Sequence, residues 1–347
     1  MRAAVLTRPG GPGAVTVIDV PRPSPAADEV LVEVAACGVC GHDQADRTGL
    51  LTVPLPAVLG HEVAGTVVEA GPAVRRFAVG DPVATKQFST CGYCGPCTSG
   101  EELRCAQRSF TYGGFAEYVV LRESALLAVP PGVPLAEAAV VACAVGTGLQ
   151  ALRRIARVRA GETVLVTGAG GGLGLHAVQV ARALGARVVA LTGDVGKAGR
   201  LRSLGAGHVL TMGDQTWQDV LDATEGHGAD VVLDNTGHPA VFRQAFRALA
   251  HAGRYVLTGQ VGGEPLRVHP AFVFAKEAVI TGSGSTSMST FSDAMDMVAD
   301  ARVRPVLAAY PLDDAVRAFT DLDERRVVGR AVLVPGAHAP HENRGEQ

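Results

Sequence analysis

The segment Val164-Leu-Val-Thr-Gly-Ala-Gly-Gly-Gly-Leu-Gly174 decides the fold of this chain. A short apolar run enters a glycine cluster, and apolar side chains then recur at the spacing of one helix face, at Leu173, Ala177, Val180, Ala181 and Leu184. This pattern predicts a strand, a tight turn and a helix. Glycines let the backbone approach a pyrophosphate closely, and the free N–H groups at the start of a helix favour an anion. We therefore expect a dinucleotide-binding loop.

The glycine motif is not a strict G-x-G-x-x-G, because counting from Gly168 puts Leu173 where the last glycine should stand. The register that fits is Ala169-x-Gly171-x-x-Gly174, and a purely structural turn is the alternative. The loop residues predicted to hold the cofactor are Gly168, Ala169, Gly171, Gly172, Leu173 and Gly174.

The residues after this loop continue the alternation of strands and helices. Strand-like runs follow at Arg187–Thr192, His208–Leu210, Asp230–Asp234, Arg254–Thr258 and Ala278–Gly282. Helix-like segments such as Pro239–Leu249 separate them. About six strands alternating with helices predict an α/β fold with a doubly wound parallel sheet.

Length and composition set the broad class. A chain of 347 residues favours two domains, and a net charge of −3 without a concentrated basic face argues against nucleic acid and membrane partners. The apolar stretch Ala136–Leu149 is too short to span a bilayer, and Met1–Leu6 lacks the length of a signal-peptide core. We expect a soluble cytoplasmic protein with a disordered tail over Gly336–Gln347.

The first part of the chain has a different character. Residues Val5–Val34 alternate apolar and polar runs broken by proline-rich turns, which predicts β-strands. The stretch Cys37-Gly-Val-Cys40-Gly-His42-Asp43 follows. A C-x-x-C pair can be a redox couple, but no helix pattern of the thioredoxin kind accompanies it. Gly60-His61-Glu62 comes next, and such a pair taken alone is more often structural than a ligand pair.

Four cysteines give the strongest local signal, at the spacing Cys91-x2-Cys94-x2-Cys97-x7-Cys105. Their thiolates, interleaved with glycines and a proline, can wrap one tetrahedral zinc ion. Such a site leaves no open coordination position, so its role would be structural. An iron–sulfur cluster also takes four cysteines and stays as the alternative.

Cys143 stands alone in the apolar stretch Val140–Gly148, which by itself favours inert core packing. Taken together, however, Cys40, Gly60-His61-Glu62, the four-cysteine lobe, Cys143 and the glycine loop resemble the zinc-containing medium-chain dehydrogenase/reductase family, close to its tetrameric microbial alcohol dehydrogenases. The resemblance covers residues 1–335.

The resemblance implies two domains and an oligomer. A mainly β, GroES-like catalytic domain would span residues 1–145, with a structural-zinc lobe at about 88–108, and would resume over residues 286–335. A Rossmann NAD(P)-binding domain would occupy residues 146–285. Members of this family are homodimers or homotetramers.

The resemblance also assigns roles residue by residue. The catalytic zinc ligands match Cys40, His61 and Cys143, and Glu62 matches an acidic neighbour that reaches the metal transiently. Asp43 matches the carboxylate that orients the ligand histidine. The cofactor contacts match Thr147, beside the nicotinamide, and Arg330, at the pyrophosphate. Cys37 matches no ligand.

The residues themselves agree with that chemistry. Three protein ligands leave one coordination position of a zinc ion for water or substrate, and zinc is a Lewis acid that stabilises an alkoxide or polarises a carbonyl. With a dinucleotide as the hydride carrier, the set indicates an alcohol dehydrogenase that binds two zinc ions per chain and acts on a small alcohol, aldehyde or ketone.

His42 departs from the family pattern. Ser or Thr usually follows the first zinc cysteine by two residues and passes the alcohol proton toward solvent, whereas this chain has His42. An imidazole can accept that proton itself, or water can carry it instead. Relatives that lack the hydroxyl sometimes reduce carbon–carbon double bonds conjugated to a carbonyl, so such a reductase is a second hypothesis.

Thr192 is the other departure. NAD-specific members place Asp or Glu at the end of the second strand of the cofactor domain, to bind the ribose diol. Without that carboxylate, Lys197 and Arg200 could meet a 2′-phosphate, Asp194 could bind the hydroxyls, or the basic pair could simply be a solvated helix face. The preference between NAD and NADP stays open. A non-catalytic dinucleotide-binding protein is a third hypothesis, against which the intact Cys40, His61 and Cys143 set argues.

Overall fold

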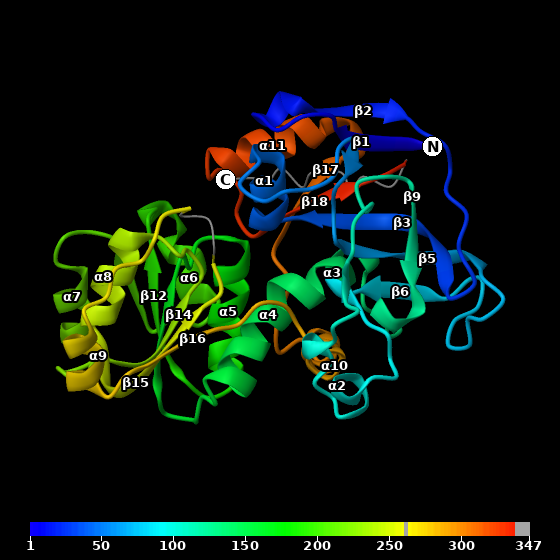
Figure 1. Ribbon diagram of the computed structural model, residues 1–347. Coiled ribbons are helices and arrows are strands. Elements are labelled where there is room, and N and C mark those ends of the chain that lie inside the picture. The colour runs from blue at the N-terminus through cyan, green and yellow to red at the C-terminus, as the bar shows by residue number, and fades with distance from the viewer. Residues whose placement is uncertain (260–262, 337–347) are drawn as a thin grey trace. The chain divides into compact units, whose positions relative to one another are not determined.

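The structure, a computed structural model, describes residues 1–259 and 263–336. The chain divides into two compact units: residues 1–140 together with the chain from 307 onward, and residues 141–306. In Figure 1 the colour follows the chain from the first unit (blue to cyan) through the second and back to the first (red). Apart from Gly336, the predicted tail lies outside the described residues.

The second unit contains the predicted parallel sheet. Its six strands lie in the order β13-β12-β11-β14-β15-β16, and every neighbouring pair is parallel. The strands are β11 (Thr163–Thr167), β12 (Arg187–Thr192), β13 (His208–Thr211), β14 (Ala229–Asp234), β15 (Leu249–Leu257) and β16 (Val279–Gly282). The doubly wound prediction is therefore confirmed. The predicted strand bounds agree within one residue except at the start of β15, because Leu249 pairs with Ala229 and starts this strand instead of ending a helix.

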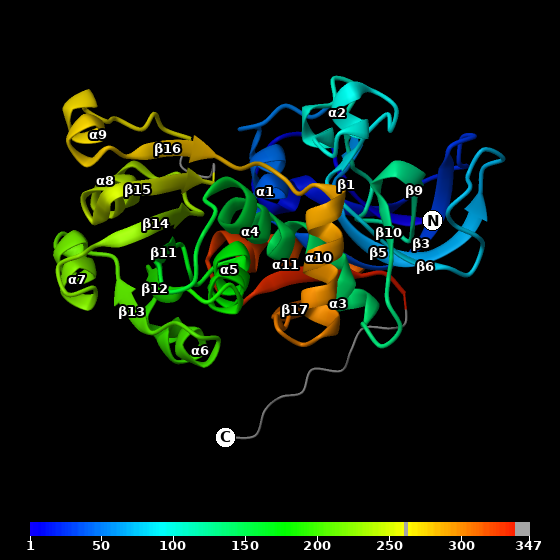
Figure 2. The same cartoon turned by 90° about the horizontal axis from the view of Figure 1, so that it is seen from below.

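Helices cover both faces of this sheet. Figure 2 shows α4 and α5 on one side of it and α7 and α8 on the other. The side chains of α7 and α8 pack with those of the strands in a core that includes Leu165, Val232, Phe246 and Tyr255. The helices after β11 are α5 (Gly172–Ala183), α6 (Ala198–Ser203), α7 (Thr216–Ala223), α8 (Pro239–Arg247), α9 (Pro270–Lys276) and α10 (Met288–Ala299), and the 3₁₀ turn η6 (Val195–Lys197) precedes α6.

A helical run before β11 is longer than its apolar stretch suggests. It consists of α3 (Leu135–Val140), the π-helical η4 (Val141–Val145), α4 (Gly146–Leu149) and the π-helical η5 (Gln150–Ile155). At 21 residues it is long and apolar enough to cross a membrane, so the expectation that it is too short was wrong. However, 83% of its most apolar 18-residue stretch is buried inside the protein, as in the core helix of a globular domain.

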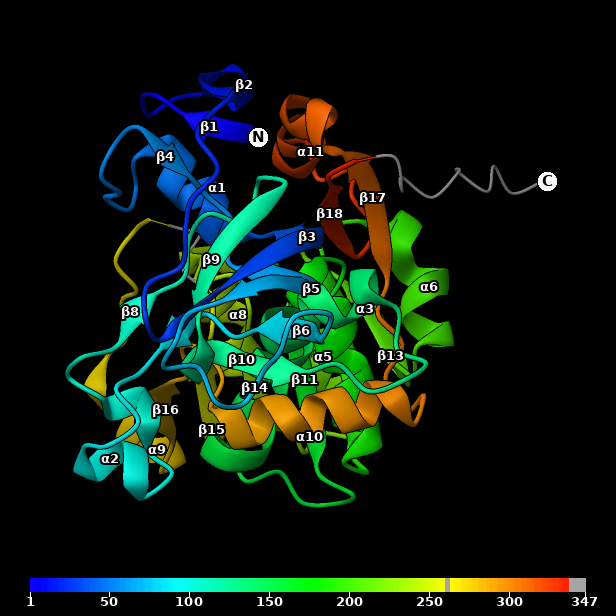
Figure 3. The same ribbon diagram turned by 90° about the vertical axis from the view of Figure 1, so that its right-hand side faces the viewer.

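The first unit is mainly β. Its largest sheet has the order β10-β6-β5-β3-β18-β17, with β9 also paired to β3 (Figure 3). The long strand β3 is central to this sheet, and the core around it includes Val32, Val63, Leu126 and Phe319. A second sheet has the order β2-β1-β4, and β7 pairs with β8.

The elements of the first unit follow in chain order. The strands are β1 (Arg2–Leu6), β2 (Val15–Asp19), β3 (Glu29–Val39), β4 (Ala57–Val58), β5 (Glu62–Ala70), β6 (Pro82–Thr85), β7 (Phe88–Ser89), β8 (Ser109–Phe110), β9 (Tyr118–Arg122), β10 (Leu126–Ala128), β17 (Leu307–Pro311) and β18 (Arg330–Val334). The helices and 3₁₀ turns are η1 (Pro12–Ala14), α1 (Gly41–Thr48), α2 (Gly95–Thr98), η2 (Glu102–Arg104), η3 (Glu123–Ala125), η7 (Leu312–Asp314) and α11 (Ala315–Asp323).

The segment 286–306 groups by contact with the second unit. Thr286 donates its hydroxyl to the Ala142 carbonyl at 2.7 Å, and Arg153 pairs with Asp293 of α10. These bonds hold α10 against the helical segment 141–155.

Candidate active site and metal centre

Cys40 joins the central strand to a helix. It directly follows β3 and caps the N-terminus of α1: its Sγ accepts from the His42 N–H at 3.2 Å, and its own N–H donates to Asp43 Oδ2 at 2.9 Å. Free N–H groups and the positive end of a helix favour a thiolate. Cys40 thus lies where a helix start favours a metal-binding sulfur.

His61 faces Cys40. Its Nε2 lies 3.3 Å from Cys40 Sγ, and its Nδ1 lies 3.3 Å from Asp43 Oδ1. Both His61 and Asp43 are buried. Burial disfavours the charged form of Asp43, but the charge and hydrogen bond of His61 outweigh it and hold the pKa of Asp43 below its ordinary value. The carboxylate therefore orients the ring so that Nε2 is directed at the thiolate.

Glu62 forms a buried ion pair. Its Oε2 lies 3.4 Å from Arg330 Nε, and its Oε1 lies 4.0 Å from His61 Nε2. Gly38 on the neighbouring strand makes room for this carboxylate, because a Cβ at position 38 would lie 2.2 Å from Oε2. The ligand atoms of Cys40, His61 and Glu62 lie within 4.8 Å of one another, which fits one small cation.

His42 lies beside this group and has partners that the sequence did not predict. Its ring stacks on Phe110 with centroids 4.5 Å apart, and its Nε2 is 3.5 Å from Asp46 Oδ2, which also accepts from the Tyr112 hydroxyl at 3.3 Å. Burial lowers the pKa of His42, and the nearby charge of His61 lowers it further. Asp43 has the opposite, smaller effect. Burial and Asp43 raise the pKa of Asp46 to about 6. Asp46 could have been found from its i,i+4 spacing to His42 on one helix face.

The four-cysteine lobe has the geometry of a tetrathiolate site. Successive Sγ–Sγ distances are 3.5 Å for Cys94 to Cys97, 3.7 Å for Cys105 to Cys91 and 3.9 Å for Cys91 to Cys97. Zinc–sulfur bonds of about 2.3 Å at tetrahedral angles give edges of about 3.8 Å. The four cysteines are therefore compatible with a structural zinc ion.

The glycine loop is built by close backbone packing. Gly168 has φ of +57°, Gly171 caps α5, and a Cβ at Gly174 would lie 2.3 Å from the Gly168 carbonyl oxygen. Only glycine at 174 lets α5 start this close to the end of β11. Ala169, whose N–H donates to the Leu191 carbonyl at 3.0 Å, fixes the turn to the sheet. The cradle fits a dinucleotide pyrophosphate at the start of α5.

Hydrogen bonds between residues close in sequence fix the backbone at the end of β12. Thr192 is buried, and its Oγ1 accepts from the Asp194 N–H at 3.1 Å. Asp194 caps η6 by accepting from the Gly196 N–H at 2.8 Å. Lys197 donates to the Gly170 carbonyl at 3.2 Å, so it lies over the glycine loop, while Arg200 is exposed. The contact of Lys197 with the loop has no sequence signal.

The remaining predicted residues lie in the second unit. Cys143 is buried in the π-helical η4, and Thr147 is buried in α4. π-Helical turns inside helices are often found at functional positions. Cys37, in contrast, is a buried thiol of the first unit whose pKa is raised by burial, with its Sγ 3.7 Å from the Gly38 carbonyl.

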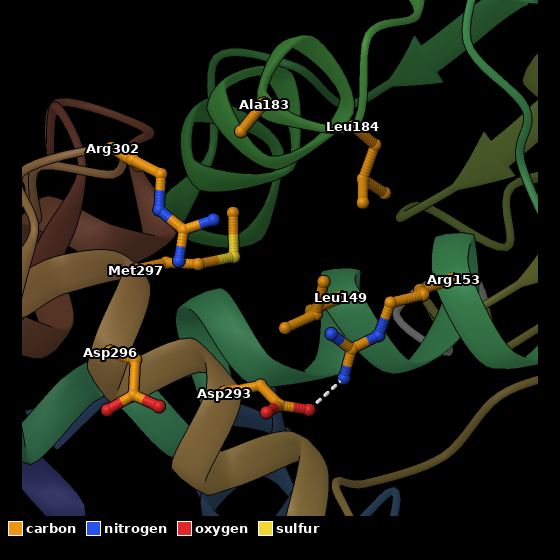
Figure 4. Close-up of a pocket in the computed structure, with 8 residues that line it drawn as sticks. All are labelled: Leu149, Arg153, Ala183, Leu184, Asp293, Asp296, Met297 and Arg302. Atoms are coloured by element: carbon orange, nitrogen blue, oxygen red, sulfur yellow. Dashed lines mark hydrogen bonds and ion pairs between the residues drawn. The ribbon is translucent and has the colours of Figure 1, made fainter.

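A pocket of the second unit has no part in this chemistry. It is lined by Leu149, Arg153, Ala183, Leu184, Asp293, Asp296, Met297 and Arg302 (Figure 4). Arg153 pairs with Asp293, and Arg302 lies 3.4 Å from Asp300. None of the predicted site residues lines this pocket, and its guanidinium groups have carboxylate partners.

Comparison with known proteins identifies the family. Residues 26–131 match the model of the alcohol dehydrogenase GroES-like domain, and residues 172–300 match that of the zinc-binding dehydrogenases. The chain belongs to the zinc-containing medium-chain dehydrogenase/reductase family. It is accordingly an oxidoreductase, with a GroES-like domain and a Rossmann cofactor domain.

Three relatives illustrate the range of activities. An acryloyl-coenzyme A reductase of Sulfurisphaera tokodaii is 31% identical over 96% of this chain and all of its own length. An NAD-dependent alcohol dehydrogenase of the same organism is 32% identical, with the same coverage. AibC, whose crystal structure is known, has 39% sequence identity to this chain, and the match covers 97% of this chain and 96% of AibC. The two structures superpose with a TM-score of 0.90.

Proposed function

We propose that this enzyme transfers a hydride between NAD(P) and an alcohol/carbonyl pair at a zinc ion held by Cys40, His61 and Cys143. The observation that carries the proposal is the Asp43–His61–Cys40 chain, in which a buried carboxylate directs an imidazole at a capped thiolate. The match to the zinc-binding dehydrogenases and the alcohol dehydrogenase relative support the same reaction.

The residues of this chain have separable roles in the reaction. Zinc, when bound, supplies a Lewis acid for the substrate oxygen. Asp43 fixes the tautomer and orientation of His61, and the α1 N-terminus keeps Cys40 as a thiolate. Glu62, held back by Arg330, is the carboxylate proposed to reach the metal transiently. His42 is the proposed proton acceptor, because its lowered pKa leaves a neutral imidazole at pH 7.

Cys143 is proposed as the third protein ligand on the strength of the family resemblance. It follows α3 by three residues in an uninterrupted helical run, and α3 packs on β3 and β5, the strands that precede Cys40 and follow His61. We expect Cys143→Ala to abolish turnover while the fold persists.

The second metal is proposed to be a structural zinc at Cys91, Cys94, Cys97 and Cys105, giving two zinc ions per chain. The three Sγ–Sγ distances near 3.8 Å support it. Elemental analysis of fully active protein tests the count, and one zinc per chain would contradict it. An iron chromophore would favour the iron–sulfur alternative.

For the cofactor, we propose that NAD and NADP are discriminated weakly, with the dinucleotide on the glycine loop, Thr147 at the nicotinamide and Arg330 at the pyrophosphate. Thr192 offers no carboxylate to repel a 2′-phosphate, and Lys197 lies over the loop. The relative named as NAD-dependent supports use of NAD.

A second candidate function is reduction of a carbon–carbon double bond conjugated to a carbonyl. Two features favour it: His42 replaces the usual hydroxyl residue, and a relative of 31% identity is named acryloyl-coenzyme A reductase. Assays with NADH or NADPH against aldehydes, ketones and enones separate the two reactions. Turnover of carbonyls alone supports the first proposal, turnover of enones alone supports the second, and no turnover by zinc-loaded protein would contradict both.

We also propose that the enzyme is a cytoplasmic homodimer or homotetramer, with the catalytic and cofactor domains divided near residues 145 and 285. The outer edge of β16 has no strand partner among the described residues. Exposed apolar side chains precede this strand in the chain at Val268, Phe272 and Phe274, and Val279 of the strand itself is exposed. An unpaired apolar edge strand is a ready template for another chain.

A further inference from the structure

Lys86 is a buried cation that the reaction does not use. Its side chain is 1% exposed, and Nζ lies 3.8 Å from Glu102 Oε1, with no hydrogen-bond partner within the part of the chain that the structure describes. An ammonium group out of water is costly unless nearby negative charge compensates it. A single carboxylate at that distance is a weak partner for it.

The backbone places Lys86 at the base of the four-cysteine lobe. The residue lies between β6 and β7, and the lobe leaves from β7 and returns through β8. The Lys86 N–H donates to the Ala125 carbonyl at 2.9 Å, and the Lys86 carbonyl accepts from the Thr111 hydroxyl at 3.3 Å. The start of the side chain is therefore held on both sides.

Glu102 connects Lys86 to the cysteines. It lies in η2, and its carbonyl accepts from the Cys105 N–H at 3.0 Å. Burial lowers the pKa of Lys86, while Glu102 and then the thiolates of Cys97 and Cys105 act in the opposite direction. Through Glu102, the Lys86 ammonium is joined to the turn that carries Cys105.

Resting on the structural zinc proposed above, we infer that Lys86 is the charge partner of the zinc tetrathiolate, a positioning residue that slows loss of the metal. Four thiolates around a divalent ion carry a net charge of about −2. The Lys86 ammonium lowers that excess, while Glu102 adds to it. The two members of the Lys86–Glu102 pair should therefore affect the metal in opposite directions.

The test is zinc release from the full-length, zinc-loaded enzyme to excess colorimetric chelator. The phase that persists in Cys143→Ala is the four-cysteine site. Lys86→Met, which keeps volume and removes charge, should speed this phase on the order of 10- to 100-fold, as loss of an outer-shell partner does. Glu102→Gln should leave it unchanged or slower, because the ammonium then faces the thiolates alone.

Two outcomes would overturn the inference. If both variants speed release equally, Lys86 and Glu102 only pack the base of the lobe. If neither changes it, the ammonium does not act on the metal. Failure of the zinc proposal is distinct, because Cys143→Ala would then show no zinc-release phase at all. Circular dichroism of Lys86→Met checks that the fold is retained.

Discussion

His42 stands where the chain departs most from its family, stacked on Phe110 and facing Asp46. If its imidazole accepts the alcohol proton, His42→Ala should lower kcat for alcohol oxidation by about 10²–10⁴, the usual worth of general acid–base assistance. Zinc content should stay unchanged, because the proposed ligands are untouched. Single-turnover hydride transfer at the wild-type rate would end the relay hypothesis, and loss of zinc would make His42 a ligand.

The same group predicts a pH dependence. Only the neutral imidazole accepts a proton, so oxidation should rise with pH through the His42 ionisation and level off above it. Burial lowers this pKa from its ordinary value of 6.5, so the rise should fall below that pH. The pH profile of wild type against His42→Ala measures it. An unshifted profile in the variant would indicate that water carries the proton.

Thr192 is the basis of a further prediction, about cofactor preference. Thr192→Asp should move kcat/KM toward NADH, because a carboxylate binds the ribose diol and repels a 2′-phosphate. Lys197→Ala is the matched variant and should weaken the binding of NADPH more than that of NADH. A wild-type preference for NADH above about a thousandfold, roughly 4 kcal/mol, would contradict weak discrimination and implicate Asp194.

At the level of elements, the metal lobe should be the part of the first unit most dependent on zinc. Residues 91–105 contribute one side chain, Cys105, to the buried apolar set, so little besides the metal holds them. Cys94→Ala should lower the apparent Tm by more than about 5 °C. Thr98→Ala, an exposed change in the same lobe, is the control. Equal Tm values for both variants would argue against a structural metal.

Elements with a strong local pattern were predictable. β12 has the predicted bounds, because its apolar run is bounded by charged and turn-forming residues. β15 begins earlier than predicted, since Leu249 continues the sheet through a register shift that no periodicity signals. The run 135–155 was underestimated because Gln150, Arg153 and Arg154 end the apolar stretch without ending the helical run.

In the candidate site, too, features with a local sequence pattern were predictable and features that depend on the tertiary fold were not. Spacing predicted the four cysteines from 91 to 105, because a tetrahedral metal site restricts it. The ligand roles of Cys40, His61 and Cys143 came instead from the resemblance to the family. Phe110, which stacks on His42, and Glu102, which pairs with Lys86, lie outside the segments that carry His42 and Lys86, so only the tertiary fold brings them together. Lys197 over the Gly170 carbonyl is a further case.

For the whole molecule, the edge of the parallel sheet predicts the assembly. Phe274 is 85% exposed and Val279 of β16 is 53% exposed, so Phe274→Asp should break a homo-oligomer built on this edge. Light scattering after size exclusion measures it. Val79→Asp, an equally apolar exposed position of the first unit, is the control. An unchanged mass for Phe274→Asp would exclude this edge as the interface.

The packing around Gly38 limits which substitutions this position tolerates. Its backbone lies outside the left-handed region, so alanine would suit its conformation, yet the Glu62 carboxylate fills the space that a side chain needs. A saturation screen should therefore score Gly38 as intolerant for a reason invisible in its own dihedral angles. Glu62→Ala should act as a suppressor of Gly38→Ala, restoring folding yield without restoring turnover, so that the two positions behave as one heritable unit.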